Sequence, residues 1–266
     1  MSLMGQYRRI MSYNLKVRLL QLFNFIASIF AVSYAFYTGE FHWLWVSLAS
    51  WFVIGHISAI ITLHRMLTHR SFKTWPWLEN ILVWLSVYST IGPTIAWVGL
   101  HRMHHVNSDK AGDPHTPYID GKFNYWAAFK VWVGYDWQVE AISLKYVKDL
   151  IRSPLHKFIF NHYFKIIIIT GLILFAINPL LFLFVYALPA TLTVQVIGLV
   201  NVLGHKHGYR NFETTDRSTN SWLAAIIALG EGWHNNHHAN PGRWYAGEKW
   251  WELDPMGWII KLIKIN

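Results

Sequence analysis

Four long runs of apolar residues dominate the chain, and each is long enough to cross a bilayer as a helix, which takes about 20 residues. The runs cover approximately residues 19–37, 43–63, 158–177 and 180–203. A short turn at Gly39 and Glu40 joins the first two runs. The last two are joined at Asn178-Pro179, where proline ends one helix and begins the next. The pattern predicts an all-α integral membrane protein with four transmembrane helices arranged as two hairpins.

A fifth apolar run, from Leu78 to Val98, is also long enough to span. Basic residues lie on both sides of it, at Lys73 and Arg102, and Gly92-Pro93 interrupts it. We therefore predict that this run forms a re-entrant or interfacial segment. At the end of the chain, the stretch from Met256 to Ile263 mixes lysines with apolar residues, which predicts a second helix lying on the surface.

Lysine and arginine are distributed unevenly along the chain. They lie before the first span, between the second and third, or after the fourth, except for Lys165 at the start of the third span. By the positive-inside rule, both termini and the long middle loop face the cytoplasm. We expect a single multi-pass membrane domain over residues 1–266, in a bacterial inner membrane or the endoplasmic reticulum. Its helical cytoplasmic cap would comprise residues 64–157 and 204–266.

Composition supports a membrane protein and limits its chemistry. Hydrophobic residues make up 53% of the chain and charged residues 14%, against about 25% charged in a typical soluble domain. Cysteine is absent, which excludes disulfides, iron–sulfur clusters, thiolate-ligated haem and a cysteine nucleophile. The net charge of +9 would suit nucleic acid, but basic residues beside apolar spans are the usual orientation signal. No nucleic-acid binding is expected.

Nine of the 15 histidines gather in four short groups that the predicted topology places on one side of the membrane. They are His64 and His69 in HRMLTH, His101, His104 and His105 in HRMHH, His205 in NVLGH, and His234, His237 and His238 in HNNHH. Two spans separate the first two groups from the last two. Because an even number of crossings returns the chain to the same compartment, all nine side chains can converge just outside the lipid.

Helical spacing predicts how these histidines divide. Residues four apart share a helix face, so His101 lies beside His105 and His234 beside His238. The second histidine of each H-x2-H-H group is adjacent to the third and points about 100° away from it. Neutral imidazole is a good ligand for iron, copper or zinc. Nine such ligands are too many for one ion, and they predict a di-metal site with four or five histidines for each ion.

The other six histidines lack such partners. Five are predicted to have surface or interfacial roles: His42, His115, His156, His162 and His207. His56 lies inside the second span, where a polar group is costly, and is interpreted as a packed structural histidine.

Other metal chemistries fit this inventory less well. A structural zinc site needs about four ligands, and the H-E-x-x-H motif of hydrolytic zinc enzymes does not occur. A haem-binding membrane electron carrier stays an alternative, although haem between spans would place histidines inside them. A metal transporter would need ligands along the crossing path, where only His56 lies.

The carboxylate pattern differs from that of soluble di-iron proteins. Soluble di-iron bundles use two E-x-x-H motifs with further carboxylates, whereas only Glu231 to His234 has that spacing here. We therefore interpret Glu231 as a hydrogen-bond acceptor for the second ring nitrogen of a ligand histidine. Asp109 and Asp113 are further candidates for that role.

The segments HRMLTH, HRMHH and GEGWHNNHH, with NVLGH between the last two, resemble the histidine boxes of the membrane fatty-acid desaturases, particularly the delta-9, stearoyl-type branch. The resemblance covers the chain from about Thr62 to His238. It implies two iron ions held by the nine histidines, with Asn201 holding a metal-bound water and O2 as co-substrate. The implied reaction is O2-dependent desaturation of a long-chain fatty acyl group. Hydroxylation and oxidative decarboxylation of fatty acids at similar boxes remain alternatives.

The resemblance also implies a narrow apolar tunnel for the acyl chain. Trp97 and Trp126 are candidates to line it, together with Trp132 and Trp137. Animal acyl-CoA enzymes carry an Arg-Asp pair that contacts CoA just before the second box, where this chain has Gly99-Leu100. An acyl group linked to a lipid or to a carrier protein is therefore at least as good a candidate substrate as acyl-CoA.

The reaction needs electrons, and no fused cytochrome or ferredoxin domain fits in the remaining sequence. We expect a separate donor, such as ferredoxin or a small cytochrome. Four basic residues could attract an acidic donor to the cytoplasmic face: Lys206, Arg210, Arg217 and Arg243.

Overall fold

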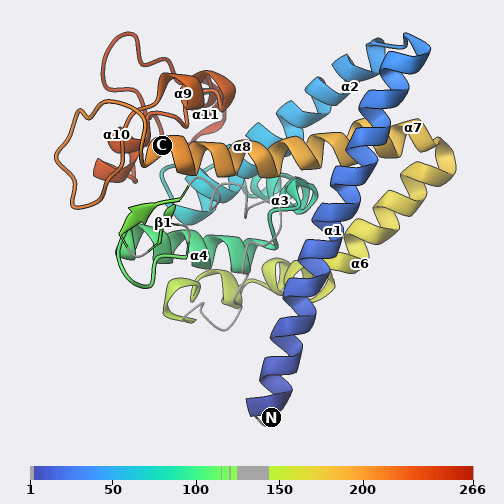
Figure 1. The fold of residues 1–266 in the computed structure, drawn as a ribbon. Coiled ribbons are helices and arrows are strands. Elements are labelled where there is room, and N and C mark those ends of the chain that lie inside the picture. Colours follow the sequence, from blue (N-terminus) through green and yellow to red (C-terminus); the bar gives the residue numbers. More distant parts are fainter. Residues whose placement is uncertain (1–2, 115, 120, 125–143, 266) are drawn as a thin grey trace.

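Among the residues that the structure describes, four helices are long and apolar enough to cross a membrane. A computed structural model describes residues 3–114, 116–119, 121–124 and 144–265, and it is mostly helical (Figure 1). The candidate spans are Leu15–Thr38, His42–Thr68, Pro154–Ile177 and Pro179–Gly204. The prediction of four such helices is confirmed, and each helix is somewhat longer than the apolar run that predicted it.

The spans are assembled from α-helical and π-helical pieces. In chain order these are α1 (Leu3–Thr38), α2 (His42–Trp51), the π-helix η1 (Phe52–Thr68), α6 (Pro154–Ile177), α7 (Pro179–Leu181), the π-helix η5 (Phe182–Ala187) and α8 (Leu188–Gly204). The side chain of Asn178 accepts a hydrogen bond from the backbone N–H of Leu180, so this residue caps α7 while Pro179 begins it. One helix therefore ends and the next begins at Asn178-Pro179, as the sequence analysis expected.

The remaining elements lie mainly at one end of the spans, on the left in Figure 1. They are α3 (Pro76–Ser86), η2 (Val87–Ser89), α4 (Thr94–Asn107), β1 (Tyr118–Ile119), β2 (Lys122–Phe123), η3 (Leu144–Tyr146), η4 (Leu150–Arg152), α9 (Trp222–Ile227), α10 (His234–Ala239) and α11 (Pro255–Ile263). The two strands form a short antiparallel hairpin. Helix α11 is the predicted C-terminal helix, with Met256 and Ile260 buried and Leu262 exposed.

The π-helix η1 determines where the first two histidines point. In η1, hydroxyl groups donate hydrogen bonds to carbonyl oxygens five residues earlier, from Thr62 to Ile57 at 2.9 Å and from Thr68 to Leu63 at 2.8 Å. The backbone N–H of His69 likewise donates to the carbonyl oxygen of His64. A π-helix closes its hydrogen bonds over five residues, so it places residues five apart close together. The ring centroids of His64 and His69 are 4.8 Å apart.

The fifth apolar run is a broken helix. Helices α3 with η2 and α4 meet at an angle of 83°. Two residues at the break have left-handed φ angles, Thr90 at 55° and Gly92 at 125°, and Pro93 then starts α4. The break brings α4, with its three histidines, under η1, where Ala96 and Leu100 join Ile61 in one buried core.

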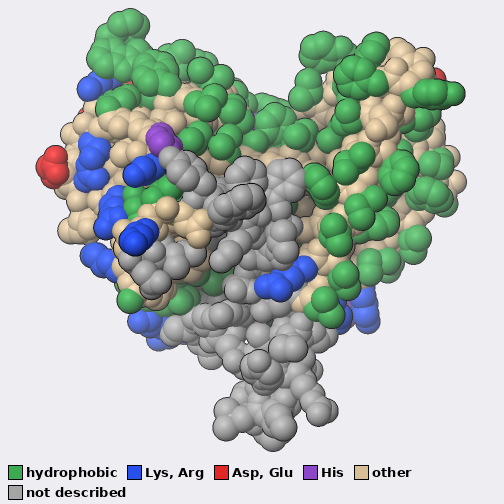
Figure 2. Space-filling view, in the orientation of Figure 1, with side chains coloured by type: hydrophobic (Ala, Val, Ile, Leu, Met, Phe, Trp, Pro, Cys, Tyr) green, Lys and Arg blue, Asp and Glu red, His purple; other side chains and the backbone are tan. Residues whose placement is uncertain are grey.

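Large apolar side chains cover the outside of the spans. Phe36, Trp45, Leu172 and Ile177 are all exposed, and Figure 2 shows apolar side chains over the arm that contains α6 and α7. A surface of this kind is costly in water, which fits contact with lipid.

A buried arginine ties the second span to the part of the chain after the fourth. Arg65 of η1 is 3% exposed. It donates from Nε to Glu231 at 2.7 Å, and from a terminal nitrogen to Asp254 at 2.7 Å and to the carbonyl oxygen of Trp244 at 2.9 Å. A buried charge of this kind is tolerated only with such partners, so Arg65 fixes the segments of Glu231 and Asp254 against η1.

Replacing this arginine should destabilise the fold. Arg65→Met leaves two carboxylates buried without their cation, and we expect the free energy of unfolding to fall by roughly 3–5 kcal/mol. Thermal unfolding of the chelator-treated protein in detergent, followed by circular dichroism, measures this without a contribution from metal. Arg70→Met is the matched control, because Arg70 is exposed and its pair with Asp149 contributes at most about 1 kcal/mol. Equal stability of the two variants would contradict the role given to Arg65.

Candidate metal centre

The structure brings all nine histidines of the four groups together at one end of the spans. Their ligand atoms form two sets, and within each set these atoms lie within 4.8 Å of one another. One set contains His64, His69, His101, His105 and His237, and the other contains His104, His205, His234 and His238. Each set could hold one metal ion.

The division between the sets follows helical spacing. On α4, His101 and His105 share one set while His104 faces the other. On α10, His234 and His238 share the second set, while His237 belongs to the first set with His101 and His105. Each of these helices therefore contributes to both sets and holds them side by side. Metal binding by these residues stays a prediction.

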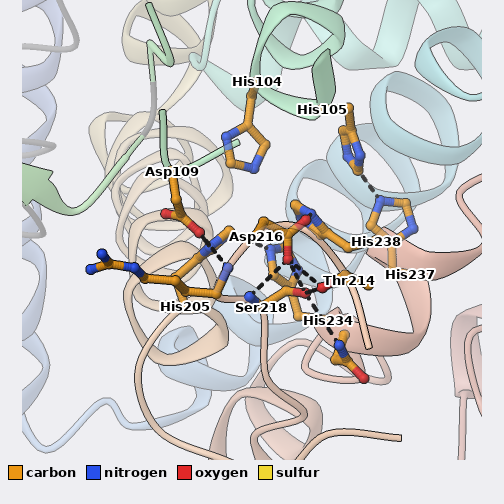
Figure 3. A network of polar contacts seen from close by, with 12 residues as sticks. His104, His105, Asp109, His205, Thr214, Asp216, Ser218, His234, His237 and His238 are labelled. Carbon is orange, nitrogen blue, oxygen red and sulfur yellow. Dashed lines mark hydrogen bonds and ion pairs between the residues drawn. The ribbon is translucent and has the colours of Figure 1, made fainter. Parts of the chain in front are cut away.

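Carboxylates lie behind four of the nine rings and accept hydrogen bonds from Nδ1. The pairs are His64 with Glu231 at 2.5 Å, His104 with Asp113 at 2.9 Å, His205 with Asp109 at 2.8 Å and His238 with Asp216 at 2.8 Å. Figure 3 shows the pairs made by Asp109 and Asp216. Such a bond fixes the orientation of the ring and increases the basicity of the opposite nitrogen.

These bonds leave the Nε2 atoms directed inward. A neutral ring that donates Nδ1–H to a carboxylate keeps its lone pair on Nε2. The Nε2 atoms then crowd together, at 3.0 Å between His64 and His237 and at 3.1 Å between His205 and His234. In each pair the two nitrogens either share one ring proton in an N–H···N hydrogen bond or direct both lone pairs at a shared cation.

Two further ring nitrogens test whether a metal fits. Nε2 of His69, in the first set, and Nε2 of His238, in the second, are buried without a hydrogen-bond partner among the described residues. A buried polar atom without a partner is costly, and a metal ion in each set would satisfy both atoms. The residues therefore fit two metal ions held mainly by nitrogen.

Burial keeps the imidazoles neutral. It lowers the pKa of His105, His234 and His237 well below the usual value, and repulsion between neighbouring rings adds to this effect. Burial also lowers the pKa of His238 to about 4, although Asp216 acts in the opposite direction. The rings can therefore act as ligands at neutral pH without first losing a proton.

Charge partners keep the carboxylates ionised. Burial alone would raise the pKa of Glu231, but its interactions with His64 and the Arg65 guanidinium outweigh burial and lower that pKa to about 2. The pKa of Asp109 is also lowered, because the hydrogen bond from His205 outweighs the effect of burial. Both groups remain negative acceptors throughout the neutral range.

An apolar pocket leads to the two sets. The space inside its walls, including its open mouth, is about 590 Å³. Its lining consists of Ala59, Ile60, His64, Trp97, His101, Val196, Ile197, Val200, Asn201, Ala228, Glu231 and His234. The ring of Trp97 stacks on His101 with centroids 4.9 Å apart. Trp97 and Asn201 therefore both lie where a bound chain would meet the metal sets.

The other predicted residues have mixed outcomes. His56 is buried and lies 3.3 Å from the carbonyl oxygen of Ile227, as expected for a packed histidine. The surface or interfacial role predicted for His156 is wrong: its ring is buried, and Nδ1 lies 2.8 Å from the hydroxyl of Thr94. Four of the candidates lie outside the described residues. They are the candidate tunnel residues Trp126, Trp132 and Trp137, and the predicted surface histidine His115.

Sequence reasoning missed Asp216 and the two asparagines of HNNHH. Asn235 accepts hydrogen bonds from the backbone N–H groups of Asn211 and Phe212, both at 2.8 Å. Asn236 donates to Glu252 at 2.7 Å. Both asparagines therefore hold α10 against neighbouring loops. No local motif points to Asp216, which lies 22 residues from His238 in the sequence.

Comparison with known proteins agrees with this site. The family model described as fatty acid desaturase matches residues 8–261. A protein of Anabaena variabilis named sn-1 stearoyl-lipid 9-desaturase is 35% identical, over 87% of this chain and 85% of its own. A Synechocystis protein of the same name is 34% identical, over 87% and 72%. The delta-9 acyl-lipid desaturase 2 of Arabidopsis thaliana is 34% identical, over 84% and 72%. The chain belongs to the fatty acid desaturase family.

Proposed function

We propose that this fatty acid desaturase acts on long-chain acyl groups of membrane lipids and introduces a Δ9 double bond at two iron ions. One observation carries the proposal: two sets of inward-facing histidines lie at the inner end of an apolar pocket. The names of the similar proteins from Anabaena variabilis, Synechocystis and Arabidopsis thaliana support the lipid-linked substrate and the position of the double bond.

The overall reaction is balanced by two electrons and two protons. A –CH2–CH2– unit and O2, with two electrons and two protons, give –CH=CH– and two molecules of water. When bound, the two irons would supply O2-derived oxidising power strong enough to break an unactivated C–H bond, which acid–base side chains cannot do. Imidazole suits iron, and the protein's own part is to position the acyl chain.

The pocket walls perform that positioning. The apolar side chains of the lining would exclude water from a bound acyl chain; among them are Ile60, Val196 and Val200. Trp97 packs against His101 and so fixes one wall beside a ligand ring. Asn201 lines the same space, and in this proposal its side chain would hold a water beside a bound metal ion. A bound chain is thereby held near the metals with few conformations available.

A lipid-linked acyl group fits the pocket surroundings better than acyl-CoA. Gly99 and Leu100 occupy the positions where the animal acyl-CoA enzymes carry a charged pair. In the structure both are buried within α4, and Leu100 is 1% exposed. These positions therefore offer no charge to a nucleotide, whereas a lipid substrate needs none.

The proposed orientation follows the distribution of charge. Lysine and arginine avoid the turns after the first and third spans, so we place both histidine sets, and the helical cap that carries them, on the cytoplasmic side, with the spans as two hairpins. Electrons would come from a separate donor such as ferredoxin or a small cytochrome. An acidic donor would be attracted by basic residues on that side, and the candidates are Lys206, Arg210, Arg217 and Arg243.

Lipid analysis tests the proposed reaction directly. A bacterial host with a defined fatty-acid profile that expresses the chain should gain a Δ9 double bond in its lipids, detected by mass spectrometry after derivatisation. His238→Ala should abolish the product, because its ring lies in the second set, whereas His162→Ala should retain it. Hydroxy acids or terminal alkenes in place of the new double bond would show that the site performs a different oxidation.

The carboxylate behind His238 should control metal affinity. Asp216→Asn keeps a hydrogen-bond acceptor but removes its charge, and we expect a 10–100-fold loss of affinity for one of the two ions. After dialysis against a chelator, plasma mass spectrometry should find close to one metal per chain in this variant and two in the wild type. Glu213→Gln, an exposed neighbour, is the control. Retention of both metals by Asp216→Asn would contradict the role of the carboxylate.

Filling the pocket should block turnover without removing metal. Ile197→Trp places an indole in the space proposed for the acyl chain, and we expect desaturation of an 18-carbon chain to fall about tenfold or more. Ile169→Trp makes the same change on the exposed face of α6 and should leave turnover unchanged. Normal activity of the Ile197→Trp variant would show that the acyl chain binds outside this pocket.

A further inference from the structure

A basic and aromatic surface lies directly above the second histidine set. Figure 2 shows Lys and Arg side chains on the lobe that carries β1 in Figure 1. Three exposed basic residues belong to the segments next to His205, namely Lys122 in β2, Lys206 and Arg217. We refer to these three residues with Tyr118 and Phe123 as the hairpin surface.

Cation–ring contacts order the hairpin surface. The guanidinium carbon of Arg217 lies 4.1 Å from the ring centroid of Tyr118, and the ammonium nitrogen of Lys206 lies 5.3 Å from that of Phe123. The two aromatic rings are themselves in edge contact at 5.3 Å. The positive charges are therefore held in place on the strand hairpin, where a partner can contact them.

Two short hydrogen-bond paths join the hairpin surface to a histidine of the second set. The hydroxyl of Tyr118 donates to the backbone carbonyl oxygen of His205 at 2.8 Å. The backbone N–H of Arg217 donates to Asp109 at 2.8 Å, and the same carboxylate oxygen accepts from Nδ1 of His205 at 2.8 Å. A partner seated here would be separated from His205 by a single side chain.

The other two basic residues considered for the donor, Arg210 and Arg243, already pair within the protein. Arg210 donates to the carbonyl oxygens of Thr214, Asp216 and Ser218. Arg243 forms an ion pair with Glu248. Neither is positioned like Lys206 and Arg217, whose charged groups lie over aromatic rings next to His205.

We propose that the hairpin surface is the docking site of an acidic electron-carrier protein and that electrons enter the metal centre beside His205. The inference rests on the proposed function, which needs two electrons for each double bond. A one-electron carrier would therefore dock twice per turnover, each time becoming oxidised as the metal centre is reduced. Charge attraction of this kind accelerates encounter and weakens with salt.

Charge reversal tests the docking site. In the metal-loaded enzyme in nanodiscs, Lys206→Glu with Arg217→Glu should weaken binding of reduced ferredoxin, an acidic carrier, by about tenfold or more and flatten its salt dependence. Stopped-flow absorbance measures the reduction rate of the metal centre against ferredoxin concentration. Lys261→Glu on α11 reverses one charge on another part of the chain and is the control for Lys206→Glu alone. The neutral pair Lys206→Gln with Arg217→Gln should give an intermediate effect.

A small chemical reductant, which needs no protein docking, distinguishes a loss of docking from damage to the metal site. With dithionite, the charge-reversed variant should be reduced at the wild-type rate and should contain two metals per chain. Unchanged ferredoxin dependence in the charge-reversed variant would overturn the proposal, as would an equal loss of rate with both reductants. Reduction of the metal centre is measured without an acyl substrate. A negative desaturation assay would therefore contradict the proposed function without deciding whether the electron carrier docks here.

Discussion

The whole arrangement depends on bringing neutral imidazole lone pairs together in a buried space. Nine rings from four chain segments point inward, and four of them are held from behind by carboxylates that accept from Nδ1. Such a cluster is incomplete by itself, because the buried Nε2 atoms of His69 and His238 lack hydrogen-bond partners among the described residues. Cations would complete it, so the fold must supply enough stability elsewhere to hold the rings ready.

Two helices with unusual geometry bring the ligand rings to this space. The π-helix η1 places His64 and His69 side by side although they are five residues apart. The sharp break before Pro93 turns α4 under η1, so that its histidines reach both sets. A straight α-helix at either position would direct some ligand rings away from the site, since its faces repeat at three and four residues.

The sequence predicted those features of the fold and the site that depend on local patterns of residues. The apolar runs marked the four long helices, Gly92-Pro93 marked the break, and the H-x2-H-H spacing indicated that each helix serves two sets. The π-helix was not predictable in this way, because an apolar run fits either helix, and the hydroxyl bonds of Thr62 and Thr68 become evident only in the structure. Asp216 lies 22 residues from His238, and loop conformation alone brings them together. The burial of His156 likewise depends on its contact with Thr94.

The two histidine sets also differ in charge. Three carboxylates lie behind the second set, at Asp109, Asp113 and Asp216, whereas Glu231 lies behind the first and shares its charge with Arg65. An ion bound in the second set would therefore have the more negative surroundings, which would favour tighter binding. Glu231, by contrast, connects ligand orientation to folding, because the arginine that neutralises it also binds Asp254. The first set is thus coupled to the packing of the protein, and the second to the surface through Asp109 and Arg217.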